Sequence, residues 1–434
     1  MIKNLNRIKR NIYSGISMEG LKIFTQFFFP PLMILTWGIE NFGIWVFILS
    51  IPNIILIFNV NFNDASVNEM TILNAKRKFK KSNEIFQNTI IFVLANIMIV
   101  SFVLVLFILL NNNDFKIFDG VKIKELKIIY TLIIISVYLK LIEPLFSTCL
   151  NSVGKIFIGY YLEGYIDFLT KFSIVIYGIF NQSLVSATFI FFLFSVFKFI
   201  LNYYFFIKYR NILTFSFELV SKKQILRLLK LSLGHISDIY SNILKHSGVI
   251  FIAGIFLNPM MIGYIATVKT LFYFLPARLF GKINFAINYE LANLYGGKKI
   301  NQIKKILTKY ILIVSILIIL SFVTCLIAGP FVYNYWLGNK YELNFIFLML
   351  ITLDVSIFIF RQALVSFYAA INRNIILGLS DLFFTFLGII FLFINFYTLK
   401  NYIFAFSILL FFSIISLIFT ICILLFFNKF KTIR

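Results

Sequence analysis

The stretch TIIFVLANIMIVSFVLVLFILL, residues 89–110, decides the fold class. It carries no charge, and it exceeds the roughly 20 residues that an α-helix needs to cross about 30 Å of hydrocarbon. Similar apolar runs recur at 308–328 and 402–427. In a bilayer every backbone amide must be satisfied within its own segment, whereas barrel strands would be short and alternating. The sequence therefore predicts an all-α integral membrane protein.

Composition supports this class and limits what the charge can mean. Of 434 residues, 61% are hydrophobic and 13% are charged, against about 25% charged residues in soluble domains. The net charge of +23 suggests an anionic partner, but Lys, Asn, Ile and Phe are all in excess. Position is therefore more informative than number. Cys149, Cys325 and Cys422 are isolated in apolar runs, which predicts no metal site and no disulfide framework.

The apolar segments predict twelve transmembrane helices. The expected spans are 14–36, 42–63, 86–111, 127–150, 155–180, 184–208, 227–257, 260–282, 307–330, 343–371, 375–398 and 402–428. Most Lys and Arg residues lie in alternate connections, and the other connections hold only Lys116, Lys122, Lys124, Lys127, Lys340 and Lys400. The positive-inside rule then places both termini in the cytoplasm, and the basic stretch at 1–13 is a retained start.

Two cytoplasmic connections resemble each other at an offset near half the chain. EMTILNAKRKF, residues 69–79, aligns with ELANLYGGKKI, residues 290–300, and FGI at 42–44 aligns with IGY at 262–264. This predicts a duplication of six helices, with parallel repeats because six is even. The expected domains are an N-terminal lobe at 1–208, a cytoplasmic linker at 209–226 and a C-terminal lobe at 227–434.

Ionisable residues inside the predicted spans indicate a hydrated central cavity, because a charge on a lone helix costs about 2.5–3.5 kcal/mol at the bilayer centre. Some can be internal ion pairs, such as Glu163, Asp167, Glu143 and Asp354. Others, such as Lys198, Arg278 and Asp381, can extend to the cytoplasmic surface. We expect the deeper cations to line a path for an anionic substrate; they are Lys22, Lys171, Lys245, Lys269 and Arg361.

The seventh helix contains both histidines of the chain, in GHISDIYSNILKHSG at 234–248. At helical spacing one face presents His235, Asp238, Asn242 and His246. A histidine and a carboxylate on a cavity wall could exchange protons, although a neutral histidine bonded between helices is an equal alternative. The predicted ion-coupling residues are Asp167, Asp238 and His246.

Catalytic signatures are missing from the sequence. It has no GxxxxGK[ST] phosphate loop, no HExxH and no GxSxG, and its outer connections are short. We therefore expect a transporter, which is not an enzyme and has no cofactor.

Three segments resemble the Wzx-type polysaccharide flippases of the multidrug/oligosaccharidyl-lipid/polysaccharide exporter superfamily. They are 42–90, with its glycine, Pro52, small and acidic residues and basic loop; YELANLYGGKKINQIKKILTK at 289–309; and VYNYWLGNKY at 332–341. Lys171, Lys245 and Lys269 match no motif of that family.

This resemblance implies a two-lobed, twelve-helix flippase in the bacterial cytoplasmic (inner) membrane. It would move an undecaprenyl-pyrophosphate-linked oligosaccharide of an O-antigen, lipopolysaccharide or capsule by ion-coupled alternating access, as an antiporter. Implied partners are the lipid-linked oligosaccharide, membrane lipids, a polysaccharide polymerase and glycosyltransferases, but not nucleic acid.

Two other functions stay open. A multidrug or cation exporter of the same superfamily would be expected to have an acidic, aromatic cavity. A membrane polysaccharide polymerase would be expected to have a large outer loop with Arg and acidic groups.

Overall fold

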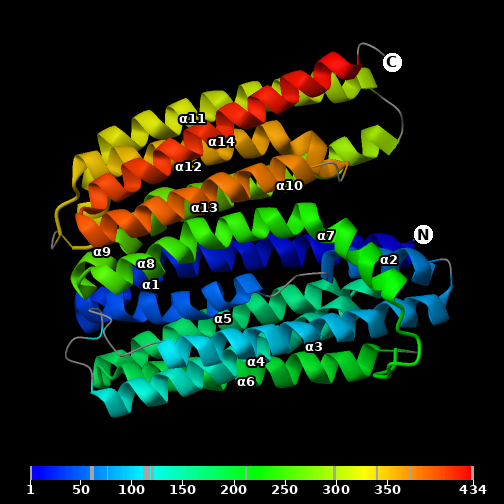
Figure 1. The fold of residues 1–434 in the computed structure, drawn as a ribbon, viewed down its shortest axis with the longest axis horizontal. Coiled ribbons are helices and arrows are strands. Elements are labelled where there is room, and N and C mark those ends of the chain that lie inside the picture. The colour runs from blue at the N-terminus through cyan, green and yellow to red at the C-terminus, as the bar shows by residue number, and fades with distance from the viewer. Residues whose placement is uncertain are drawn as a thin grey trace. The chain divides into compact units, whose positions relative to one another are not determined.

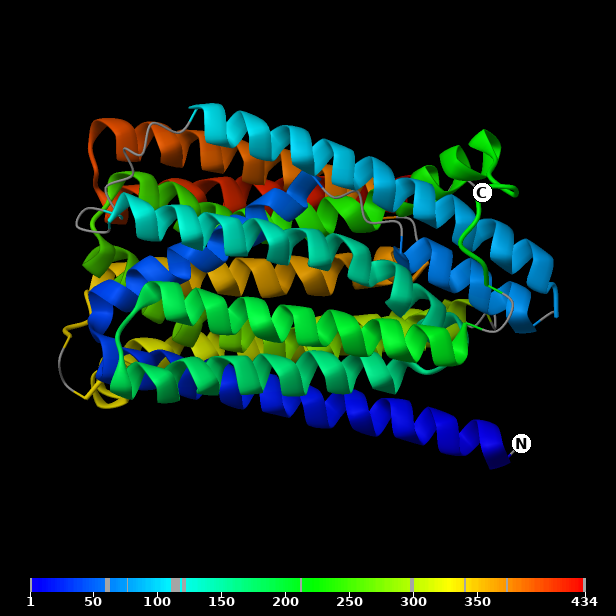
Figure 2. The ribbon, with the colours of Figure 1, turned by 90° about the horizontal axis from the view of Figure 1, so that it is seen from below.

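The computed structural model describes residues 2–58, 63–75, 77–110, 118, 122–210, 213–296, 300–338, 341–371 and 374–431. Within these ranges the chain is helical and contains no strand (Figure 1). It divides into two compact units, Met1–Leu233 and Gly234–Arg434. Long helices run roughly parallel or antiparallel within each unit, as a second view also shows (Figure 2).

The first unit is built from six long or intermediate helices and the start of a seventh. These are α1 (Ile2–Ile55), α2 (Asn63–Ala75), α3 (Phe79–Leu110), α4 (Ile123–Ser152), α5 (Ile156–Phe180), α6 (Leu184–Tyr209) and α7 (Lys222–Ile243), with a 3-10 turn at Leu56–Phe58 after α1.

The second unit contains the rest of α7 and the following helices. These are the π-helix η3 (Leu244–Gly248), α8 (Val249–Phe256), α9 (Pro259–Lys269), the π-helix η4 (Thr270–Phe274), α10 (Leu275–Gly296), α11 (Ile300–Trp336), α12 (Phe345–Ala370), α13 (Ile375–Thr398) and α14 (Tyr402–Lys431).

Length and composition confirm the predicted membrane class. In the described part of the chain, ten helical stretches are long and apolar enough to cross a bilayer. One of them, Tyr13–Ile55, contains a break at Gly38 and so gives two crossings. Helix α5 is long enough with 25 residues, but Glu163, Asp167 and Lys171 lower its hydropathy. Counting both brings the total to the twelve expected crossings.

The break in α1 has a clear local cause. Gly38 has φ 78° and ψ 165°, a left-handed region in which a glycine carries no Cβ penalty. The amide of Gln182 donates to the Thr36 carbonyl oxygen at 2.7 Å, which satisfies a carbonyl at the helix end. Next to the break, the buried Trp37 packs so closely against Gly178 of α5 that a Cβ there would lie 1.6 Å from the indole Nε1. Together these contacts fix the turn between the first two crossings.

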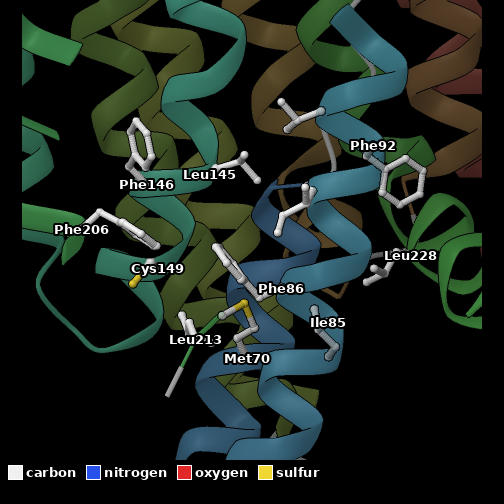
Figure 3. Close-up of a cluster of buried hydrophobic side chains, with 12 residues drawn as sticks. Met70, Ile85, Phe86, Phe92, Leu145, Phe146, Cys149, Phe206, Leu213 and Leu228 are labelled. Atoms are coloured by element: carbon white, nitrogen blue, oxygen red, sulfur yellow. The ribbon is translucent and has the colours of Figure 1, made fainter. Parts of the chain in front are cut away.

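The core of the first unit joins residues far apart in the sequence (Figure 3). Phe86 of α3 stacks on Phe206 of α6 with ring centroids 5.9 Å apart, and Phe146 of α4 lies 5.4 Å from Phe206. The same buried cluster includes Leu213 and Leu228, which follow α6. The first turns of α7 therefore belong to the packing of the first unit.

Residues 213–221, here called the strap, are held against α3 by buried amide side chains. Asn83 accepts from the Thr214 backbone N–H at 3.0 Å, and Gln87 accepts from the Leu219 N–H at 2.9 Å. Asn88 accepts from the Ser221 N–H at 3.0 Å. The same amides donate back to Thr214, Ser216 and the Leu219 carbonyl. The connection between α6 and α7 is thus fixed in place along the strap.

This packing differs from the predicted domain boundaries of 1–208, 209–226 and 227–434. The division between the two compact units falls after Leu233, inside α7. The reason is the buried face of the first α7 turns, since Leu228 is fully buried in the core of the first unit. The predicted boundaries describe the limits of a duplicated sequence with a cavity between its two lobes. In that sense they stay a prediction.

Candidate functional site

Five charged side chains come together inside the second unit. Lys245 lies in η3, Lys269 ends α9, and α13 supplies Asp381; the other two, Asp354 and Arg361, are on α12. Lys269, Arg361 and Asp381 are each only 2% exposed. We call these five residues the ionic cluster.

Asp381 is the centre of the ionic cluster. Lys245 Nζ donates to its Oδ1 at 3.0 Å and its Oδ2 at 3.2 Å, and Arg361 Nη1 lies 3.3 Å from Oδ2. Two hydroxyls also donate to the carboxylate, Ser241 at 2.5 Å and Ser416 at 2.9 Å. A buried carboxylate is tolerated only when its charge and lone pairs are matched in this way.

Arg361 of α12 makes further contacts with the two helices α13 and α14. Its Nη2 donates to the Leu377 carbonyl at 2.6 Å and its Nε donates to Thr420 Oγ1 at 3.2 Å. The planar guanidinium can hold several acceptors in fixed directions. It therefore fixes α12 against α13 and α14.

Two π-helical segments shape the cluster. Lys245 lies within η3, and Lys269 is the residue immediately before η4. Because a π-helix shifts hydrogen bonding by one residue, it re-aims side chains and is frequent at functional sites. Lys269 Nζ donates to the Lys245 backbone carbonyl at 2.7 Å. The ammonium also lies 5.7–5.9 Å from the centroids of the Tyr273, Phe274 and Phe406 rings.

A small cavity of about 20 Å³ borders the cluster, with Lys245, Lys269, Asp354 and Asp381 in its wall. It has room for about one water molecule. Asp354 accepts from Ser413 at 2.7 Å. The cluster as a whole holds three cationic side chains against two carboxylates, so its fully ionised form is positive.

Three of the five predicted path cations are therefore in one buried cluster. Lys245 and Arg361 both contact Asp381, and Lys269 contacts backbone and aromatic rings. This geometry stabilises the packing of α12, α13 and α14 around η3. A role of Lys245, Lys269 and Arg361 on a substrate path stays a prediction.

The first unit has a second polar region, which we call the polar strip. Lys22 of α1 pairs with Glu163 of α5 at 2.8 Å, and Asp167 pairs with Lys171 one turn on at 2.9 Å. Their exposed side-chain fractions are 13% for Lys22, 56% for Glu163, 39% for Asp167 and 27% for Lys171. The strip is therefore accessible, in contrast to the ionic cluster, and its charges balance.

The polar face predicted for the seventh helix is divided between different surroundings. Asp238 accepts from the Asn374 side chain at 2.9 Å. His246 instead packs against Tyr273 and Phe274, at 5.1 and 4.5 Å between ring centroids, and its buried Nδ1 has no hydrogen-bond partner among the described residues. The side chain of His235 lies outside the described part of the chain. Ion coupling through Asp167, Asp238 and His246 stays a prediction.

Sequence reasoning missed the central role of Asp381. We expected this carboxylate to extend to the cytoplasmic surface, and that expectation is wrong, because it is 2% exposed and bonded to two cations. A signal was present in α14, where Ser413, Ser416 and Thr420 follow one another at i, i+3 and i+7 in the otherwise apolar stretch 408–427. Such a stripe of hydroxyls indicates buried polar partners.

Comparison with known proteins adds to this picture. No protein-family model and no curated protein matches the sequence. Among solved structures, the lipid II flippase MurJ in an inward closed conformation is similar with a TM-score of 0.66 and 15% identity, over 95% of this chain and 87% of that one. The chain has the fold of MurJ.

The same fold occurs in multidrug transporters. An inward-facing MATE family transporter of the MOP superfamily gives a TM-score of 0.65 with 12% identity, over 91% of this chain and 92% of that one. A MATE transporter of Vibrio cholerae, VcmN, gives 0.57 with 12% identity, over 97% and 95%. At these identities the likeness shows the fold: an all-α, two-lobed, twelve-helix membrane architecture.

Proposed function

We propose that the protein is a flippase of the MOP superfamily that moves an undecaprenyl-pyrophosphate-linked oligosaccharide across the bacterial cytoplasmic membrane. The observation that carries the proposal is the fold shared over nearly the whole chain with a protein described as a lipid II flippase. The Wzx-like segments at 42–90, 289–309 and 332–341 support the same substrate class. We propose an O-antigen, lipopolysaccharide or capsule repeat unit as the cargo.

The polar strip supports an anionic headgroup. Lys22 and Lys171 lie on helices long enough to span the bilayer, where an unneeded charge is costly. Both remain partly exposed, so a pyrophosphate could exchange with the carboxylate that each one contacts. In the proposed mechanism these two lysines meet the headgroup, and the lipid tail remains in the bilayer.

The cycle is proposed to be alternating access coupled to a proton or sodium gradient, with no cofactor. Both termini would be cytoplasmic, as the charge of the connections predicts. The proposed partners are the membrane lipids, a polysaccharide polymerase and glycosyltransferases.

Export of organic cations is the second candidate, and one observation favours it. In the polar strip the carboxylates of Glu163 and Asp167 are more exposed than the lysines with which they pair. An acidic surface of this kind would attract a cationic drug rather than a pyrophosphate. The MATE likeness of the fold is compatible with this function too.

Transport by the full-length protein in proteoliposomes tests the two candidates. One assay follows a fluorescent undecaprenyl-pyrophosphate oligosaccharide, and the other follows an organic cation dye. We expect the lipid-linked probe to cross, and K22Q/K171Q to slow it at least tenfold while E163Q/D167N has a smaller effect. The matched control is K122Q/K124Q, which removes two exposed lysines at the start of α4.

Each candidate can fail separately. Transport of the dye without movement of the lipid-linked probe would overturn the flippase proposal in favour of cation export. Movement of the probe at an unchanged rate in K22Q/K171Q would remove the polar strip from the headgroup path.

A further inference from the structure

The strap and the first turns of α7 present an exposed surface on which apolar and basic side chains alternate. Its members are Phe215, Phe217, Lys222, Leu226, Lys230 and Leu233, and we call it the strap surface. The two phenylalanines are 48% and 57% exposed, and the two leucines are 55% and 42% exposed. Lys222 and Lys230 are exposed as well.

The first turns of α7 have two different faces. Leu228 and Ser232 are buried, with Leu228 in the core of the first unit. On the outer face, Lys222, Leu226 and Lys230 follow at i, i+4 and i+8, so they are aligned along the helix. A helix face in water is normally polar. Leucines between lysines are instead typical of a helix at the boundary between headgroups and acyl chains.

The level of this surface relative to the bilayer follows from α3. Its first ten residues include Lys80, Lys81, Glu84 and Asn88, the last charge is at Glu84, and the mainly apolar run begins at Thr89. The polar-to-apolar transition near Asn88 therefore marks the edge of the hydrocarbon. Because Asn88 accepts from the Ser221 N–H at 3.0 Å, Lys222 begins α7 at this same level.

The strap surface is also held rigidly. The ring of Phe215 lies 5.7 Å from that of the buried Phe86, and the amides of α3 fix the strap backbone. Arg227 donates to Glu69 of α2, and this bond raises the pKa of the guanidinium. A preordered surface loses little conformational freedom on binding.

We propose that the strap surface binds the headgroups of anionic phospholipids, with its lysines on the phosphates and its phenylalanines and leucines among the upper acyl chains. The inference does not depend on what the protein transports. Charge complementarity selects this occupant, since the exposed carboxylate of Glu218 is outnumbered by Lys222, Lys223 and Lys230. The stretch that connects α6 to α7 would then sense the charge of the leaflet.

A local photocrosslink measures the lipid in contact. The full-length protein, carrying the photoreactive p-benzoylphenylalanine in place of Leu226, is placed in nanodiscs of equal POPG and POPC. Mass spectrometry then gives the ratio of crosslinked POPG to POPC. We expect POPG to be enriched, and K222Q/K230Q to lower the enrichment by up to about 30-fold, since each lysine near an anionic surface contributes about fivefold.

The control places the same photoreactive residue at Ile319 of α11, which is 65% exposed, lies ten residues from the nearest lysine of that helix and should label both lipids equally. Enrichment should fall in 0.5 M NaCl, because salt shortens the Debye length. It should persist with excess glycerol 3-phosphate. Three outcomes would each overturn the proposal: a POPG to POPC ratio near one at position 226, no lipid adduct at that position, or full displacement of the lipid by glycerol 3-phosphate. Lys222 and Lys230 are exposed, so their replacement should leave the fold intact. The single change K230Q is a second variant, with a smaller expected loss of enrichment.

Discussion

Replacement of Asp381 by Asn should destabilise the second unit more than any single change among its cationic partners. The substitution leaves Lys245 and Arg361 buried without their shared carboxylate. Removal of one partner from a buried ion pair costs about 3–5 kcal/mol. Arg361 keeps acceptors at Leu377 and Thr420, so the largest part of the cost falls on Lys245.

The opposite change, K245M, should cost less. Asp381 would still contact Arg361 and would still accept from Ser241 and Ser416. We expect a loss of about 1.5–3 kcal/mol, the contribution of a hydrogen bond to a charged group. The double variant K245M/D381N should be no less stable than D381N, because it buries one unmatched cation instead of two.

The assay is thermal unfolding of the purified full-length protein in one detergent. Size-exclusion chromatography after heating to each temperature measures the fraction of protein that remains folded. With about 2–4 °C per kcal/mol for a unit of this size, D381N should lower the midpoint by roughly 10 °C and K245M by roughly 6 °C. The double-mutant cycle measures the coupling between the two positions. Equal losses for the two single variants, or a larger loss for K245M, would refute the reasoning.

Two other substitutions test the packing of the first unit. G178A should lower the free energy of unfolding by about 1–3 kcal/mol, because the new Cβ would overlap the Trp37 indole. G159A in the same helix meets nothing within 4 Å and should be neutral in the same thermal assay. Equal stability of the two variants would contradict the close contact. Q87L should leave the Leu219 N–H without its acceptor and speed cleavage of the strap in limited proteolysis, while Q302L at an exposed position should leave the rate unchanged.

Much of the architecture could be predicted from local properties of the sequence. Uninterrupted apolar runs such as 89–110 define crossings because the bilayer has a fixed thickness. Helix α5 could be predicted as a crossing despite its charges. Glu163, Asp167 and Lys171 are spaced along one helix face, and Asp167 and Lys171 pair directly. These signals need no knowledge of which helix packs against which.

The details of the two polar regions could not be predicted in this way. The expected face through Asp238 and His246 assumed 3.6 residues per turn, and the π-helix at Leu244–Gly248 changes that period between them. The partners of Asp381 come from α7, η3, α12 and α14, so they depend on tertiary packing. Asn83, Gln87 and Asn88 likewise look like an ordinary polar helix start until the strap is placed beside them.

The fixed strap determines where the chain can be divided into two fragments. A polypeptide ending at residue 208 would contain the first six crossings but would lack Leu213 and Leu228, which complete its hydrophobic core. A fragment ending at residue 233 would keep both. The end of the first predicted repeat, at residue 208, and the end of the first compact unit therefore differ by about two dozen residues. Independently expressed halves should reassemble only when the chain is divided after residue 233.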